Sequence, residues 1–192
     1  MRNAATRRPG GRTAAVTARI NRACLELVVE EGASACTFGT VAERAGVERS
    51  TLYRRYADEW EMMLGALIAH AGDDIVPDLT GSLASDLTSV ARKLVIQLES
   101  PLGPAVVGTA AELRAHSGQD YSRTFFDHRM AQLKPMFDAA IARGELPPAT
   151  DTEEMFSMVA GPIYFRLFIA ARPIDEAWID RLVESICWLF CR

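Results

Sequence analysis

The chain has 192 residues, of which 49% are hydrophobic and 24% are charged, and its formal net charge at pH 7 is −4. This hydrophobic content excludes a disordered protein and suffices for one domain of moderate size or two small ones. The acidic balance excludes a protein that coats nucleic acid without regard to sequence. Because the chain has no apolar run of about 18 residues and no apolar stretch near its start, we expect a cytoplasmic protein without a membrane span or signal peptide.

The charge is unevenly distributed along the chain. Residues 1–60 hold ten Arg and seven acidic residues, a balance of +3, whereas residues 61–192 have a balance of −7. A cationic N-terminal part on an acidic body is typical of a protein that places one end on DNA. Six Arg and no acid occur in the first 22 residues, and a Pro-Gly-Gly run lies among them. These features predict a flexible basic arm over residues 1–12, which either follows a DNA groove or is a solvated terminus.

Three helices are predicted in the N-terminal part of the chain. Apolar residues recur at intervals of three and four, which predicts one amphipathic helix over about residues 12–31. The second helix begins at Thr37, whose hydroxyl can accept a hydrogen bond from a free backbone N–H of the first turn. Gly46 falls where the chain needs a left-handed residue to leave this helix and enter the third, and Val47 is expected beneath that turn.

The third helix has one apolar face and one polar face. At about 100° per residue, Leu52 and Tyr56 share the inner face, and the opposite face is centred on Ser50 and Arg54. An outer face of hydroxyl and guanidinium groups suits insertion into a major groove, where such groups meet base edges and phosphates. A helical hairpin with a solvated charged face has the same local pattern, so both interpretations remain open at this point.

Residues 16–68 together resemble the DNA-binding domain of the TetR family of bacterial transcriptional regulators. The resemblance rests on the first amphipathic helix, Gly32, Thr37, Val41, Ala42, the Ala45-Gly46-Val47 turn, the Thr51-Leu52-Tyr53 run, Met62, Met63 and Leu67. It implies an all-α fold of about nine helices, in which a three-helix helix-turn-helix domain precedes a helical ligand-binding and dimerisation domain. The DNA-contacting residues expected from the outer face and the resemblance are Thr37, Arg49, Ser50, Thr51, Tyr53, Arg54 and Arg55.

The chain departs from the family's usual pattern at four positions. Glu48 stands where the family commonly has a capping Ser, and Arg55 stands where it commonly has His. Glu59 replaces a Lys that often contacts phosphate, and Gly39 replaces a longer polar side chain. We therefore expect the neighbouring arginines to take over part of the contacts that Glu59 and Gly39 cannot make.

Beyond the third helix the chain shows only helical periodicity. Asp58 and Glu61 have the spacing of a capping box that opens a linking helix to about Ala71, and a loop follows. Further helices are predicted over residues 82–99, 105–116, 121–143, 151–171 and 175–191, with Pro135 bending or dividing the third of these. We divide the chain into a basic arm (1–12), a helix-turn-helix domain (13–57) and a helical effector-binding and dimerisation domain (58–192).

The last two predicted helices are apolar over more than one face. One apolar stripe is enough for the core of a monomer, so a second implies another surface to cover. We predict a homodimer in which two such helices from each chain form a four-helix bundle. The expected interface residues are Phe156, Val159, Ile163, Leu167, Trp178, Leu182, Ile186 and Leu189. A helix pair that is fully buried within a monomer is the alternative.

A cavity for a small-molecule effector, between the DNA-binding helices and the bundle, is implied by the TetR resemblance. Flexible Met and flat aromatic side chains suit an adaptable apolar pocket. The expected lining is Met63, Leu67, Leu94, Phe125, Phe126, His128, Met130 and Phe137. The alternative for each of these residues is an ordinary core position.

These features predict a ligand-responsive repressor that binds a palindromic double-stranded DNA operator as a homodimer and is released by an unknown small-molecule effector. The alternative is a dimeric helical protein that binds a small molecule or partner and has weakened DNA affinity. We expect no enzyme, cofactor, metal or membrane partner, because no metal-ligand spacing, nucleophile elbow or phosphate loop occurs. The four Cys form no C-x-x-C pair and are expected to be small buried or half-buried hydrophobic residues, with a thiol sensor at Cys187 and Cys191 as the alternative.

Overall fold

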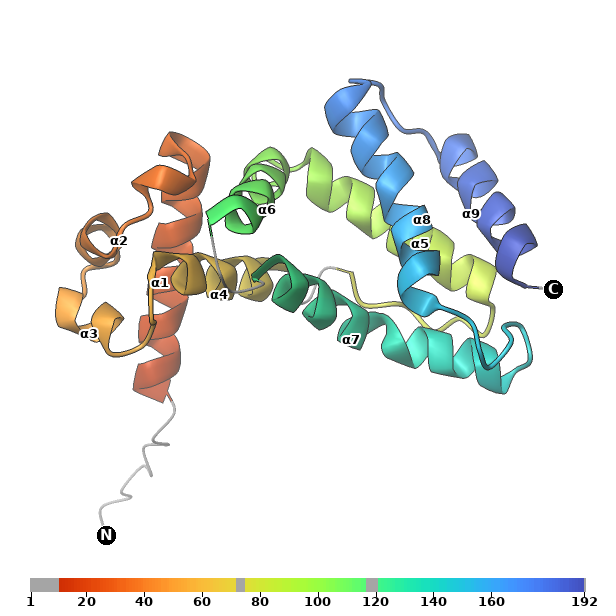
Figure 1. Cartoon of the computed structure of the whole chain (residues 1–192), viewed down its shortest axis with the longest axis horizontal. Helices are drawn as coiled ribbons and strands as arrows, with labels where there is room; N and C mark the ends of the chain where they lie inside the picture. Colours follow the sequence, from red (N-terminus) through yellow and green to blue (C-terminus); the bar gives the residue numbers. More distant parts are fainter. Residues whose placement is uncertain (1–10, 72–74, 117–120, 192) are drawn as a thin grey trace, which may run out of the picture.

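A computed structural model describes residues 11–71, 75–116 and 121–191, and within these ranges the chain is all-α with no strand (Figure 1). The helices are α1 (Gly11–Glu31), α2 (Phe38–Ala45), α3 (Arg49–Tyr53), α4 (Glu59–Ala71), α5 (Leu83–Glu99), α6 (Gly103–His116), α7 (Tyr121–Ala142), α8 (Thr152–Tyr164) and α9 (Glu176–Phe190). A 3₁₀ turn precedes α2 at Ala33–Ala35, and a π-helical turn follows α8 at Phe165–Ile169. The all-α prediction is confirmed. Most of the predicted basic arm lies outside the described residues.

The N-terminal unit is built around one hydrophobic cluster. Ile20 of α1, Val41 of α2 and Leu52 of α3 are completely buried in it. Met62 and Ala66 of α4 belong to the same cluster, because α4 packs along α1. The packing therefore does not separate two units at residue 57, since α4 completes the core formed by α1, α2 and α3.

The C-terminal unit surrounds α5. This helix packs against α6, α7, α8 and α9 and buries a continuous apolar stripe. The core residues include Leu87 and Val90 of α5, Leu133 of α7, Met155 of α8 and Ile179 of α9. Figure 1 shows α4 running from the N-terminal unit toward α7, while α6 returns from α5 to the vicinity of α1. The two units are thus joined through α4, α6 and α7.

One partly buried hydrogen bond ties α7 to the beginning of α4. The hydroxyl of Tyr121 donates to the carboxylate of Asp58 at 3.0 Å, and the ring of Tyr121 packs against Leu64 and Leu67 of α4. Asp58 also accepts a hydrogen bond from the backbone N–H of Glu61 at 2.8 Å, as the predicted capping box requires. Asp58 therefore both caps α4 and anchors it to the C-terminal unit.

Three predicted helix boundaries need correction. The helix α7 is continuous although Pro135 lies inside it, because Pro135 and Ala131 are on the exposed side, where water can satisfy the carbonyl that loses its partner. The segment predicted as one helix over 151–171 is α8 followed by a π-helical turn. The recognition helix α3 ends at Tyr53, so Tyr56 lies beyond it, where it is still half-buried.

The structure brings two cysteines together that are far apart in the sequence. The sulfur atoms of Cys24 and Cys36 lie 2.8 Å apart, and both residues are buried between α1 and the turn before α2. The hydrogen bond between the thiols and their burial raise the pKa of Cys24 well above its usual range. Both residues are therefore the small hydrophobic core residues that the sequence predicts. Cys191 is exposed, which corrects the expectation for that residue.

Replacing Tyr121 with Phe should lower the free energy of unfolding by about 1.5 kcal/mol, because a hydrogen bond to a charged carboxylate is lost. Urea denaturation at pH 7 measures this loss. The matched control is Tyr53→Phe, since the side chain of Tyr53 is 67% exposed. Equal unfolding free energies for the wild type and Tyr121→Phe would contradict the proposed role of this hydrogen bond.

The contribution of this hydrogen bond to the free energy of unfolding depends on pH. Burial and the bond to Asp58 raise the pKa of Tyr121 to about 12. Because the folded-state pKa is the higher one, the stabilisation is complete below the ordinary pKa of about 10 and is lost as the pH rises through about 12. The difference in unfolding free energy between the wild type and Tyr121→Phe should therefore shrink over this interval.

Candidate DNA-binding surface

The helix-turn-helix is shaped by caps at both ends of α2. The hydroxyl of Thr37 accepts a hydrogen bond from the backbone N–H of Thr40 at 3.2 Å, and Thr40 accepts one from the N–H of Thr37 at 3.0 Å. At the other end Gly46 adopts the left-handed conformation, with φ 62° and ψ 45°. The N–H of Val47 then donates to the carbonyl of Ala42 at 3.0 Å. These local interactions set the angle at which α3 leaves α2.

Glu59 contributes to this geometry from α4. Its carboxylate accepts a hydrogen bond from the backbone N–H of Phe38, in the first turn of α2, at 3.5 Å. A negative charge at a helix N-terminus is favourable because the unpaired N–H groups carry partial positive charge. Glu59 therefore neutralises the end of α2, a position where a free helix terminus would attract phosphate.

The outer face of α3 is polar and open to solvent. Arg49, Ser50, Tyr53 and Arg54 are exposed, and Thr51 is half-buried. The ring of Tyr53 packs edge-on against Phe38 of α2, with ring centroids 4.8 Å apart. Glu48 takes the N-cap position but makes no side-chain hydrogen bond there. The structure thus presents hydroxyl and guanidinium groups together on one surface, as the outer-face pattern predicts.

Gly39 provides the space that Arg49 occupies. A β-carbon at position 39 would lie 2.8 Å from the Nη2 atom of Arg49, which is closer than van der Waals contact allows. The guanidinium group of Arg49 therefore lies across α2, where a longer side chain would stand in other family members. This contact gives a physical reason for the departure at Gly39, and it holds Arg49 at the edge of the outer face.

Arg55 has a different role from Arg49 and Arg54. Its Nη1 atom donates to the hydroxyl of Thr17 in α1 at 2.7 Å, and its side chain is half-buried. It connects the segment after α3 to the first helix. Sequence analysis missed Thr17 as its partner, because no local spacing relates two residues on different helices.

A shallow depression of about 360 Å³ separates α1 from the turn and α3. Its lining includes Val16, Arg19, Gly46, Thr51, Arg54 and Arg55. Sequence analysis included Arg19 only in the positive charge of the N-terminal part. Its position on the polar side of the first amphipathic helix is the signal that could have identified it as a surface residue. Three arginines and one acidic residue, Glu48, thus line one concave surface, whose net positive charge suits a phosphate backbone.

The residues predicted to line one effector pocket are distributed over several places. Leu94 and Phe125 line an enclosed cavity of about 40 Å³. Met130 and Phe137 line a separate surface groove of about 410 Å³ along α7. Met63 is in the N-terminal core, Leu67 packs against Tyr121, Phe126 packs on the C-terminal core, and His128 is half-buried. The structure therefore does not bring these residues into one pocket, because helical spacing does not specify which helices meet.

The enclosed cavity also has polar groups that sequence analysis missed. Gln97, Arg129, Tyr164 and His70 contribute to its lining. Arg129 is 5% exposed and donates to the side-chain oxygens of Gln132 at 3.1 Å and Gln97 at 3.4 Å. Burial raises the pKa of Tyr164. The lining of this cavity thus combines a buried cation with a phenol and an amide.

The residues predicted for the dimer interface differ in how deeply they are buried in the chain itself. Phe156, Val159, Ile163 and Ile186 are buried in the core of the chain itself, so their assignment to a dimer interface is corrected. Leu167, Trp178 and Leu182 are partly buried, and the guanidinium of Arg166 lies 5.1 Å from the ring centroid of Trp178. Leu189 is exposed together with Met158, Phe165, Ile169 and Trp188.

Family models match both units of this fold. Residues 20–62 match the model described as bacterial regulatory proteins, tetR family, and residues 76–186 match the tetracyclin repressor-like C-terminal domain. The uncharacterized HTH-type transcriptional regulator YdeS of Bacillus subtilis (strain 168) is 30% identical over 167 residues, which cover 85% of this chain and 83% of YdeS. The chain belongs to the TetR family. This TetR-family protein is a helix-turn-helix DNA-binding transcriptional regulator and not an enzyme.

Solved structures share the fold of this TetR-family regulator. The crystal structure of the TetR-family regulator SCO0332 has a TM-score of 0.73 at 24% identity and covers 92% of this chain and 99% of its own. The flavonoid-responsive regulator FrrA has a TM-score of 0.66 at 22% identity and covers 92% of this chain and 95% of its own. Among the described helices of the present chain, none is long and apolar enough to cross a bilayer.

Gly39→Leu should weaken DNA binding by about as much as Arg49→Ala, roughly 1 to 3 kcal/mol if Arg49 reaches a base edge. The leucine side chain would displace the guanidinium group from its place over α2. Fluorescence anisotropy with a duplex selected from a random pool measures the affinity. Gly39→Ala is the control and should have a smaller effect, because the flexible end of Arg49 can shift to admit one methyl group.

A double variant shows whether the effect of Gly39 is transmitted through Arg49. Gly39→Leu combined with Arg49→Ala should bind no more weakly than Arg49→Ala alone, since the displaced group is already absent. Additive losses in the double variant would contradict the role assigned to Gly39.

Proposed function

We propose that the protein is a ligand-responsive repressor that binds a palindromic operator as a homodimer and is released by a small-molecule effector. The observation that carries the proposal is the exposed outer face of α3, where Arg49, Ser50, Tyr53 and Arg54 point away from a completely buried Leu52. Such a face on a short exposed helix can enter a major groove and meet base edges directly.

Phosphate contacts would come from the surroundings of α3. Arg19, Arg54 and Arg55 surround the depression beside α3, and the first 60 residues carry the positive balance of the chain. The acidic remainder would be held away from the phosphates by α4. In this arrangement the arginines supply orientation and salt-dependent affinity, while the outer face of α3 supplies specificity.

Dimerisation is supported by the exposed apolar residues near the end of the chain. Phe165 is 61% exposed, Ile169 73% and Trp188 66%, and Leu189 and Met158 are also exposed. Large apolar side chains grouped on two consecutive segments favour a further packing surface. A two-fold dimer formed there would place two copies of α3 in successive major grooves, about 34 to 36 Å apart, on a palindromic site.

Ligand response is supported by the way the cavity meets α4. His70, in the last turn of α4, contributes to the lining of the enclosed cavity together with residues of α5, α6, α7 and α8. An effector that enlarges this cavity would move α4 and thereby change the separation of the two recognition helices. The effector releases the operator only if it binds the two conformations with different affinity. FrrA, which shares the fold, is described as flavonoid-responsive.

The proposed sign of regulation is repression. It is supported by the similarity of residues 76–186 to the tetracyclin repressor-like C-terminal domain. A dimer that covers two half-sites on one face of the duplex would exclude other proteins from that DNA.

The alternative is a dimeric small-molecule or partner-binding protein with weakened DNA affinity. It was suggested by Glu48, Glu59 and Gly39. Gly39 makes room for Arg49 and thus fits a DNA-binding surface. Glu59 neutralises the start of α2, and Glu48 makes no side-chain hydrogen bond at the N-cap of α3, so these two carboxylates still favour the alternative. Selection of bound duplexes from a random pool, followed by a salt titration, discriminates the two functions. A palindrome with steep salt dependence is expected, whereas flat, weak binding to every sequence would favour the alternative.

Arg54→Ala should weaken binding to the selected duplex by about 1 to 3 kcal/mol if Arg54 contacts a base. The loss should be largest for the native palindrome, so that discrimination against altered half-sites also decreases. Lys134→Ala is the control, because Lys134 is exposed on α7 and pairs there with Asp138. An unchanged footprint and affinity would remove Arg54 from the contact surface.

Leu189→Arg should convert the dimer to a monomer, because an arginine without a partner would be buried in the interface. Leu189 is preferable to the partly buried Leu182, whose replacement would also disturb the core of the chain itself. Sedimentation velocity measures the mass, and circular dichroism checks the fold. Val76→Arg, at an exposed apolar residue outside α8 and α9, should leave the dimer intact. A dimer that persists in Leu189→Arg would refute this interface.

A further inference from the structure

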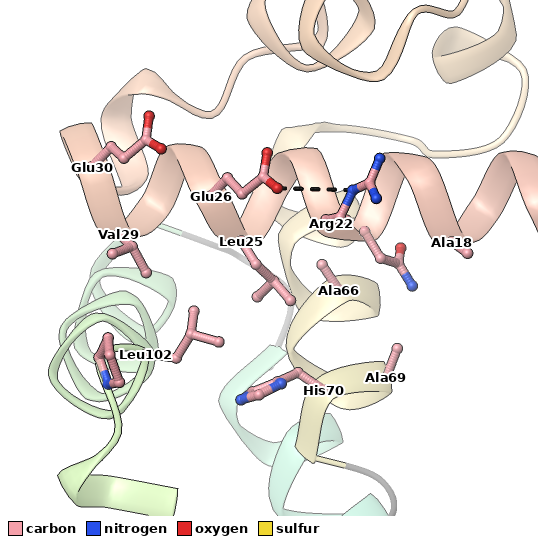
Figure 2. Close-up of a pocket in the computed structure, with 12 residues that line it drawn as sticks. Ala18, Arg22, Leu25, Glu26, Val29, Glu30, Ala66, Ala69, His70 and Leu102 are labelled. Atoms are coloured by element: carbon pink, nitrogen blue, oxygen red, sulfur yellow. Dashed lines mark ion pairs between the residues drawn. The ribbon is translucent and has the colours of Figure 1, made fainter.

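A groove of about 530 Å³ lies outside the enclosed cavity, at the junction of the two units. Figure 2 shows its walls: Leu25 and Val29 of α1, Ala66, Ala69 and His70 of α4, and Leu102 just before α6. Val29 is 41% exposed although it is a large apolar residue. The size of the groove is that of a site for a small organic molecule, whereas the enclosed cavity of about 40 Å³ has space for about one water molecule.

We propose that this groove is a binding site for a small, uncharged aromatic molecule that carries a hydrogen-bond donor. The apolar walls supply the affinity for a flat hydrophobic ring, since most of the side chains around the groove are Ala, Leu, Val and Pro. The imidazole of His70 projects between α4 and Leu102, where it can stack on such a ring (Figure 2).

The charges at the rim favour an uncharged molecule. Glu26 lies 3.8 Å from the guanidinium of Arg22, and Glu30 lies 2.6 Å from that of Arg44. Each carboxylate thus already has an arginine beside it, and neither is left to select a cation. Arg22 also lines the groove, so each rim charge stands beside one of opposite sign and the rim selects neither a cation nor an anion.

A hydrogen-bond acceptor for the molecule is supplied by Asn21. Asn21 contributes to the lining of the groove, and its Oδ1 atom is buried without a hydrogen-bond partner among the described residues. A buried carbonyl oxygen without a donor is destabilising. Rotation of the amide about its last side-chain bond would turn this oxygen to the groove, where an N–H or O–H of the bound molecule would satisfy it.

Occupation of the groove would couple the two units directly. α1 and α4 form the core of the DNA-binding helices, whereas Leu102 belongs to the turn that connects α5 to α6. A molecule packed between them would fix the angle of the C-terminal unit relative to α1. His70 also lines the enclosed cavity, so a molecule in the groove touches one wall of that cavity. The regulatory part of this inference rests on the proposed function, while the binding site itself does not.

Titration of the full-length protein with N-phenyl-1-naphthylamine, in the absence of DNA, tests the site. This probe is uncharged, aromatic and carries one N–H, and its fluorescence rises in apolar surroundings. We expect saturable binding of one probe per chain. Ala69→Trp should weaken binding by about tenfold or more, because the indole fills the space of the probe. Ala18→Trp should act in the same way from the opposite wall, since Ala18 is exposed on α1.

Two controls distinguish this site from other apolar surfaces. Ala84→Trp places the same side chain at an exposed position in the first turn of α5 and should leave the affinity unchanged. Asn21→Leu should weaken binding of N-phenyl-1-naphthylamine about fivefold, but not that of 1-phenylnaphthalene, which has no N–H. Circular dichroism confirms the fold of each variant.

The outcomes separate this inference from the proposed function. Absence of saturable binding to the wild type, or equal affinity of the wild type, Ala69→Trp and Ala18→Trp, would overturn the site. Both measurements are made without DNA, so a failure there leaves operator binding untouched. If the site is confirmed, adding the probe should change the affinity of the wild-type protein for the selected duplex. The affinity of Ala69→Trp for the same duplex should stay unchanged.

Discussion

The rest of the structure depends on α4, which packs in the core of the N-terminal unit and is hydrogen-bonded to the C-terminal unit. Its inner face, with Met62 and Ala66, completes the core of the DNA-binding helices, while its first turn is bonded through Asp58 to the buried Tyr121 of α7. A helix that is packed into one unit and hydrogen-bonded to the other cannot move independently of either. Any rearrangement of α5 to α9 that displaces α7 must therefore be transmitted to α1, α2 and α3 as a movement of one rigid helix.

The DNA-binding surface shows how one residue's departure from a family pattern is compensated by another. Glu59 carries a charge opposite to that expected for a phosphate contact, yet it stabilises the start of α2 by accepting the N–H of Phe38. Gly39 removes a side chain, and Arg49 fills the vacated space. With these two replacements, three arginines, Arg49, Arg54 and Arg55, remain on α3 or directly after it.

Two apolar surfaces of the chain have different chemistry. The segment after α8 and the end of α9 present large flat or branched side chains such as Phe165 and Trp188, which suit a protein interface. The junction groove is instead concave and is lined by small residues such as Ala66 and Ala69, which leave space for a ligand.

The sequence by itself determined the helices, the helix-turn-helix and the polar outer face, because these depend on interactions between residues close in the chain: the Thr37 cap, the left-handed Gly46 and the spacing of Leu52 from Arg54. Only the tertiary structure decided which apolar faces meet. Phe156 and Leu189 have the same apolar character, but one is in the core and the other is exposed. Helical periodicity specifies that a face is apolar, whereas its partner depends on the relative angles of helices far apart in sequence. For that reason the effector-pocket residues were scattered, and the junction groove, built from α1, α4 and the turn before α6, had no signal in the sequence.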